Sequence, residues 1–136
     1  MATKSIEAIE GIGPAYGAKL REAGCSSAAK LLAAGATRKG REQLAKSTGI
    51  SGSIILRCVN MADLFRITGV ASQFAELLEA AGVDTVKELK NRNAANLTAK
   101  MKEVNSAKKL TRAVPSEKMV SDWIQQASQL PPVVTY

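Results

Sequence analysis

The sequence predicts an all-α fold, an internally duplicated bundle of short helices in which two tight turns each join a pair of helices. Of its 136 residues, 46% are hydrophobic but only 4% are aromatic, so small aliphatic side chains fill the interior, which suits closely packed short helices. Apolar residues recur at three- and four-residue spacing, and no stretch shows the strict alternation of a half-buried strand. Glycines and hydroxyl side chains divide the chain into short segments.

Most expected helices begin after a side chain that can accept an N–H of the first turn, and several end at a glycine. In the first half the expected helices cover residues 6–10, 14–23, 28–34, 38–47 and 51–65. In the second half the pattern predicts a helix after the cap residues Asp84 and Thr85, a short helix over 96–104 and a further turn over 108–113. A last helix opens at Pro115 and Ser116, with inward positions at Met119, Val120, Trp123, Ile124 and Ala127.

A pattern of apolar and glycine residues recurs at a distance of 58 residues. It pairs Ile9 with Ile67, Gly11 with Gly69, Leu20 with Leu78, and Gly24 with Gly82. Toward the end of each half the distance grows to 65, so the second half holds about seven extra residues near 105–112. We therefore predict two repeats, 1–62 and 63–136, packed as one unit because each alone is near the lower size for independent stability.

Residues 9–14, Ile-Glu-Gly-Ile-Gly-Pro, indicate a tight turn between two short helices. Gly11 and Gly13 allow backbone angles that a side chain forbids, and Pro14 suits the first position of a new helix. The side chain of Ile12 can pack in the core beneath the turn. This order of residues resembles the helix-hairpin-helix motif of DNA-binding proteins. In that family the glycine turn presents backbone N–H groups to a phosphate at a helix N-terminus.

The resemblance implies a set of nucleic-acid-binding residues in the first half. The turn residues Gly11, Ile12 and Gly13 would hold a phosphate, with Lys19 and Arg21 in support. A second group of basic residues surrounds the start of another helix and extends this surface, or forms only a solvated face: Arg38, Lys39 and Arg41.

The second hairpin departs from the motif. Ala71 and Ser72 stand where the first hairpin has its second glycine and its proline, and Glu76 and Glu79 follow. The extra Cβ and the negative charge make this turn a poor phosphate site, so we expect it to be structural.

The net charge of +7, from 19 basic and 12 acidic residues, favours anionic partners, although charge also serves solubility alone. Residues 1–62 carry +5 and residues 63–136 carry +2, and a second basic cluster lies over 100–112. The uneven charge favours the first half as the side that meets nucleic acid.

Several function classes are excluded. The chain has no histidine, which removes histidine-based catalysis and histidine-containing zinc sites, and its two isolated cysteines cannot complete a thiolate site. We expect no metal, no cofactor and no enzymatic activity, with Cys25 and Cys58 as small core residues. No signal peptide and no apolar run of membrane-spanning length is present, which indicates a cytoplasmic protein.

Over most of its length the chain resembles a bacterial family with tandem helix-hairpin-helix motifs, catalogued as a domain of unknown function. The residues that carry this resemblance are 9–14, 40–45, 48–51, 59–64 and 78–86. More distantly, each half is similar to the small helical domain at the C-terminus of the RNA polymerase alpha subunit, which binds both DNA and proteins. That double use means that the fold alone does not decide the function.

Two hypotheses follow. The first is a non-catalytic module that binds the nucleic-acid backbone without reading sequence. The second is a protein-interaction or assembly adaptor, which would use its helical faces or the extended tail, 131–136, on another protein. The intact first hairpin and the overall charge favour the first hypothesis, whereas the weak second hairpin and the apolar tail favour the second.

Overall fold

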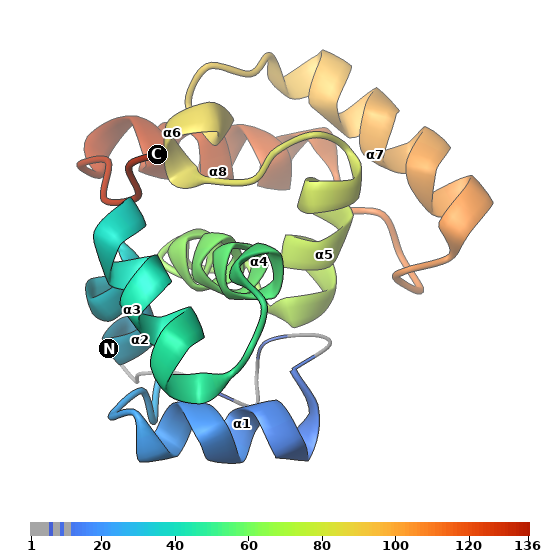
Figure 1. The fold of residues 1–136 in the computed structure, drawn as a ribbon. Coiled ribbons are helices and arrows are strands. Elements are labelled where there is room, and N and C mark those ends of the chain that lie inside the picture. The colour runs from blue at the N-terminus through green and yellow to red at the C-terminus, as the bar shows by residue number, and fades with distance from the viewer. Residues whose placement is uncertain (1–5, 7–8, 10–11) are drawn as a thin grey trace.

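The computed structural model describes residues 6, 9 and 12–136, and within them the chain forms eight α-helices and no strand (Figure 1). The predicted all-α class is therefore confirmed. Gly11 and most of the expected first helix lie outside the described residues. The helices are α1 (Gly13–Glu22), α2 (Ala28–Gly35), α3 (Arg38–Thr48), α4 (Gly52–Leu64), α5 (Ser72–Ala80), α6 (Val86–Leu89), α7 (Ala94–Lys108) and α8 (Glu117–Gln129).

Local sequence determines where most helices begin. In six of the eight helices, the residue before the first turn accepts an N–H with its own side chain, which satisfies one of the free amides of a helix start. The capping residues are Ser27, Thr37, Ser51, Thr85, Asn93 and Ser116. The caps expected at Ser27, Thr37, Ser51, Thr85 and Ser116 are thus confirmed.

Helix α7 is longer than the sequence predicts. It begins at Ala94 after its cap and continues to Lys108, where a short helix over 96–104 and a separate turn over 108–113 were expected. It ends at Lys109, which adopts a left-handed backbone with φ of +53°. Beyond it, the side chain of Asn105 bonds both the N–H and the carbonyl of Thr111. The region near 105–112, where the repeat predicts extra residues, therefore forms the end of this helix and the loop that follows it.

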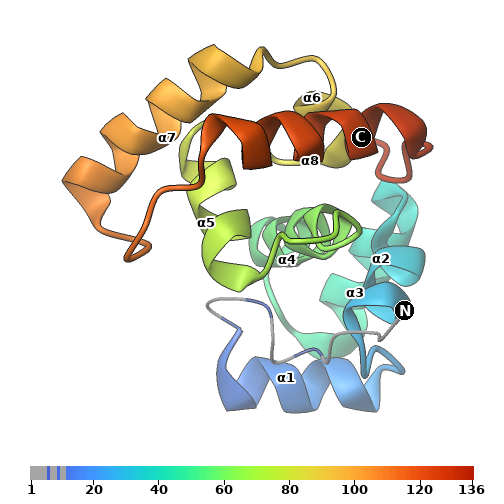
Figure 2. The ribbon, with the colours of Figure 1, turned by 180° about the vertical axis from the view of Figure 1, so that it is seen from behind.

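Helix α4 is the centre of the molecule. Its second half is buried from Cys58 through Leu64. Helices α2 and α3 pack against one side of α4, while α5 contacts it from another, and α6, α7 and α8 form the upper part (Figures 1 and 2). Helix α1 lies at the opposite end from α8.

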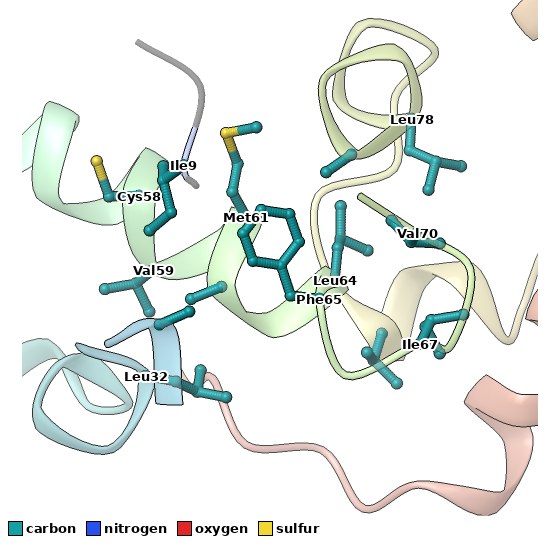
Figure 3. Close-up of a cluster of buried hydrophobic side chains, with 14 of the residues drawn as sticks. Ile9, Leu32, Cys58, Val59, Met61, Leu64, Phe65, Ile67, Val70 and Leu78 are labelled. Carbon is teal, nitrogen blue, oxygen red and sulfur yellow. The ribbon is translucent and has the colours of Figure 1, made fainter. Parts of the chain in front are cut away.

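Buried side chains from both halves meet around α4 in one continuous core. Figure 3 shows Met61 and Leu64 of α4, with Phe65 directly after the helix, between Ile9 on one side and Val70 on the other. The packing expectations for Leu20, Leu78 and Trp123 are confirmed, since each is at most 2% exposed. The inward placement of Met119 is wrong: it is 39% exposed, because the buried face of α8 runs through Val120, Trp123 and Ala127.

Local geometry recurs between the halves at the predicted distances. The N–H of Cys25 bonds the carbonyl of Leu20, and the N–H of Val83 bonds that of Leu78, each at 2.8 Å. Helices α4 and α8 each contain 13 residues and each follow a capping serine. These correspondences support the duplication, which stays a prediction.

The C-terminal tail, 131–136, has no regular secondary structure and packs against the body. Arg66, which follows α4, donates through Nη2 to the carbonyl of Pro131 at 2.9 Å. Farther along, the N–H of Thr135 donates to the carbonyl of Ala36 at 2.8 Å, and Val134 is buried. The tail therefore returns from the end of α8 to the junction between α2 and α3.

Substitution of Gly40 by alanine tests the close approach of α3 to α2. A Cβ at Gly40 would overlap the backbone carbonyl oxygen of Ala34, and that atom can move only if the two helices separate. We expect Gly40→Ala to lower the free energy of unfolding by about 1–3 kcal/mol. Gly52→Ala is the matched control, because a Cβ there meets nothing within 4 Å, and it should change stability by less than about 1 kcal/mol. Urea denaturation measures both, and equal midpoints would contradict the placement.

Candidate nucleic-acid interface

The first turn of α1 contains the described part of the predicted hairpin, from Ile12 to Pro14. Ile12 is buried, and its N–H donates to the carbonyl of Ile9 at 3.3 Å, so its side chain anchors the turn in the core. Gly13 has a φ of +67°, which a residue with a side chain rarely adopts. Pro14 follows in the first turn, and no acidic residue stands there. Gly11 lies outside the described residues.

The backbone N–H groups at the start of α1 lack a side-chain cap. Its N-cap residue is Ile12, which has no side-chain acceptor. Among the eight helices of the described residues, α5 is the other one that begins without a side-chain cap, at Ala71. These are the two helices that follow the predicted hairpins, whereas the other six are capped. An acceptor from another molecule could therefore bond the first amides of α1 without displacing a side chain.

Lys19 and Arg21 do not flank those amides. Both lie in the last turn of α1, and at 1.5 Å per residue Lys19 is about 9 Å farther along the axis than Gly13. Positive side chains at this end stabilise the helix through its dipole. They extend the positive charge along α1, but the hydrogen-bond donors at its start are backbone amides.

Arg38 and Lys39 form a separate basic surface. They are exposed in the first turn of α3, where Arg38 pairs with Glu42 at 3.3 Å. Helix α3 begins beside the C-terminal tail, whereas α1 begins on the side of α5 (Figures 1 and 2). The structure therefore does not bring these two residues together with the first hairpin.

Arg41 requires a correction, because it is not part of an exposed basic surface. It is only 7% exposed, and Nη1 donates to the carbonyls of Gly35 and Ala36 at 2.9 and 3.0 Å. Nη2 donates to the carbonyl of Thr135 at 2.6 Å, and the guanidinium lies 5.7 Å from the ring centre of Tyr136. Arg41 therefore anchors the tail. Its spacing from Leu44 and Thr48, the other buried residues of α3, is the signal in the sequence that could have shown this.

Sequence reasoning missed a groove of about 880 Å³ between α3, α4 and the end of the tail. Arg38, Lys39 and Lys46 line it together with Leu56 and Tyr136. Tyr136 is 69% exposed, the most exposed large hydrophobic side chain among the described residues. Tyr136 joins this lining because the tail returns to α3, a long-range contact that no local pattern indicates.

Side chains of α8 hold the turn of the predicted second hairpin in place. The side-chain amide of Gln126 accepts from the N–H of Thr68 at 2.9 Å and donates to the carbonyl of the same residue at 3.1 Å. A Cβ at Gly69 would come within 3.1 Å of Nε1 of Trp123, so the indole supports this turn directly. These contacts agree with the expectation of a structural turn. Glu79, expected to repel phosphate there, pairs instead with Arg57 of α4 at 3.1 Å.

The two cysteines are buried and unpaired, as expected for core residues. Burial raises the pKa of the Cys58 thiol to about 11, so it is protonated at neutral pH and is not a nucleophile. Among residues 6, 9 and 12–136, no group of three or more acidic or cysteine side chains could hold a metal ion. In the same part of the chain, no helix has the length and apolar character needed to cross a membrane.

Comparison with known proteins places the chain in a family. The model of the family described as Domain of unknown function (DUF4332) matches residues 10–130, which is most of the sequence. The chain belongs to this family. No curated protein and no solved structure was found to match it. The match runs from residue 10 to just past the end of α8, so it includes the turns before α1 and α5, while the tail, 131–136, lies outside it.

Proposed function

We propose that the protein is a non-catalytic module that binds the phosphate backbone of nucleic acid without reading its sequence. The observation that carries this proposal is the start of α1, where a glycine–proline turn leads into a helix with no side-chain cap. The net charge of +7 supports the same partner.

The donors for a phosphate would be backbone amides of the first turn. Pro14 has no N–H, so Gly13 and Ala15, both exposed, supply the first available groups. The positive end of the helix dipole adds to the attraction, and no carboxylate in this turn opposes it. Because these donors belong to the backbone, they contact phosphate oxygens and carry no base-specific information.

Ala15→Glu is the sharpest test of this site. A carboxylate in the first turn of α1 should leave the fold intact or stabilise it slightly through the helix dipole, while it repels a phosphate. We expect duplex DNA affinity to fall about tenfold at about 50 mM salt, since a like charge at contact distance costs on the order of 1–4 kcal/mol. For the parent, two to four phosphate contacts should give a slope of log affinity against log salt of roughly −2 to −4.

The control is Gln73→Glu, which makes the same charge change at the equivalent exposed position of α5, 58 residues later. It should alter DNA affinity by less than about twofold, since the second hairpin is expected to be structural. Anisotropy of a labelled duplex measures affinity, and circular dichroism checks the fold. Equal losses from both variants, or parent affinity no greater than that of a simple polycation of equal charge, would refute the proposal.

The protein-adaptor hypothesis remains the second candidate. The observation that favours it is the groove between α3, α4 and the tail, which includes an exposed aromatic ring. Among the described residues of the proposed phosphate site at the start of α1, no such exposed ring is present.

A further inference from the structure

We propose that the groove between α3, α4 and the tail binds an acidic peptide segment of a partner protein, with one apolar side chain of the segment inserted as an anchor. The groove has a volume of about 880 Å³, within the usual range for binding pockets. It is separate from the start of α1, so this inference does not depend on nucleic-acid binding.

The lining of the groove favours an apolar anchor. Ala45 of α3, Leu56 of α4 and the ring of Tyr136 contribute hydrocarbon surface from three different elements. Leu56 and Ala45 are half-buried, so they already form part of the wall and still present surface to the groove. Burial of an aliphatic side chain against such a surface contributes about 1.5–3 kcal/mol.

The charges around the groove favour an acidic ligand. Arg38, Lys39 and Lys46 are exposed cations along α3, and Glu42 is the one acidic residue of the lining. Arg38 pairs with Glu42 at 3.3 Å, which leaves the charges of Lys39 and Lys46 to attract carboxylates. A nucleic-acid backbone fits less well, because the first-turn amide of Gly40 already bonds the Thr37 side chain and a phosphate would not use the hydrocarbon surface of Ala45 and Leu56.

Tyr136 is an exposed aromatic side chain that is held in place. Its hydroxyl lies 3.4 Å from Oδ1 of Asn60, and its ring lies 5.7 Å from the guanidinium of Arg41. Arg41 is itself fixed by bonds to three backbone carbonyls. A partner that packs on this ring therefore gains contact area without the entropic cost of ordering a free side chain, which is typical of binding hot spots.

Selection from a random peptide library against the parent protein tests the proposal. We expect the recovered peptides to be enriched in aspartate and glutamate around a leucine or an aromatic residue. A fluorescein-labelled synthetic peptide of the consensus then gives affinities by anisotropy. Tyr136→Ala, and the pair Lys39→Glu with Lys46→Glu, should each weaken binding about tenfold or more, a loss of about 1.4 kcal/mol.

The matched control is the pair Lys102→Glu with Lys108→Glu, which makes the same charge change on the exposed surface of α7, away from the groove. It should change affinity by less than about threefold, as expected for a distant rim charge under salt screening. Ala15→Glu should leave peptide affinity unchanged, so a failure of the phosphate site is distinguishable from a failure of the groove.

Three results would overturn the inference. The first is recovery of no peptides, or of peptides without acidic enrichment. The second is an equal loss of affinity from the α7 pair. The third is tight binding of a single-stranded oligonucleotide that is lost in the Tyr136 and Lys39 variants, while peptide binding is unaffected by them. That result would assign the ring to base stacking.

Discussion

Replacement of Trp123 by alanine is expected to lower the free energy of unfolding by about 3–5 kcal/mol. The indole is 2% exposed, and its ring centre lies 5.4 Å from that of Phe74 with the planes inclined at 51°. It also supports the turn of the second hairpin at Gly69. The substitution would leave a cavity under this turn and remove an aromatic pair at the same time. For a domain with a total stability of about 5–15 kcal/mol, such a loss is severe.

Met119→Ala, four positions earlier on the same helix, is the control for Trp123→Ala. Met119 is 39% exposed, so its truncation should cost less than about 1 kcal/mol. Leu20→Ala and Leu78→Ala, at positions that the predicted repeat pairs, are each expected to cost about 2–5 kcal/mol because both side chains are fully buried. Thermal denaturation compares the four variants. A midpoint for Trp123→Ala within a degree or two of the parent would contradict this account of the core.

The parts of the fold that were predictable from the sequence are set by near neighbours in the chain. A hydroxyl before a helix bonds an amide three residues later, as Thr37 does with Gly40 at 3.1 Å, so the pattern alone reveals the start. Two glycines that follow helices were also recognisable from the local pattern. Gly24 follows α1 and Gly82 follows α5, and their φ values are +89° and +95°. These local bonds account for most of the helix boundaries.

The features that were not predictable depend on contacts far apart in the sequence. Arg41 bonds Thr135, 94 residues later, and no helical periodicity identifies that partner. A basic residue near a helix start is usually solvated, so the sequence favours an exposed Arg41. This prediction is wrong because the tail covers the guanidinium. The groove was missed for the same reason, since Tyr136 closes one of its walls only through the path of the tail.

The candidate sites also divide into local features, which the sequence predicts, and long-range features, which it does not. The glycine–proline start of α1 was recognisable because its geometry is local, while the support expected from Lys19 lies at the other end of the helix. Arg38 and Lys39 were correctly taken as exposed, but they lie beside the groove and not beside the hairpin. The two surfaces can therefore be impaired separately, and a single protein could contact nucleic acid at α1 and an acidic partner at α3.

Replacement of Asp63 by alanine should be about as damaging as loss of the tryptophan, for an electrostatic reason. Asp63 is 1% exposed at the end of α4, and its Oδ2 accepts the buried N–H of Val86 at the start of α6 at 2.8 Å. Its Oδ1 pairs with Nη2 of Arg66 at 2.8 Å, and that same nitrogen donates to the carbonyl of Pro131 in the tail. One carboxylate thus connects the central helix to α6 and, through Arg66, to the tail.

Asp63→Ala would leave the Val86 amide buried without an acceptor and Arg66 without its counter-charge. We expect a loss of about 3–5 kcal/mol in the free energy of unfolding, the usual cost of breaking a buried pair by removal of one partner. Asp63→Asn keeps the shape and one acceptor oxygen, so it should lose less, about 1–3 kcal/mol. Glu42→Ala is the control: its ion pair with Arg38 is exposed, and such pairs contribute about 0–1 kcal/mol.

Urea denaturation of these variants measures the losses, and hydrogen exchange locates them. In Asp63→Asn, which should remain folded, the amides of α6 and of the tail should both exchange faster than in the parent, while those of α1, which Asp63 does not contact, should keep their protection. If Asp63→Ala proved as mild as Glu42→Ala, or if faster exchange in Asp63→Asn were confined to α6, the carboxylate would not couple the tail to the body. The tail would then be held by its contacts near α3, where Arg41 bonds the carbonyl of Thr135 and the N–H of Thr135 bonds the carbonyl of Ala36, and the lining that Tyr136 adds to the groove would depend on those bonds.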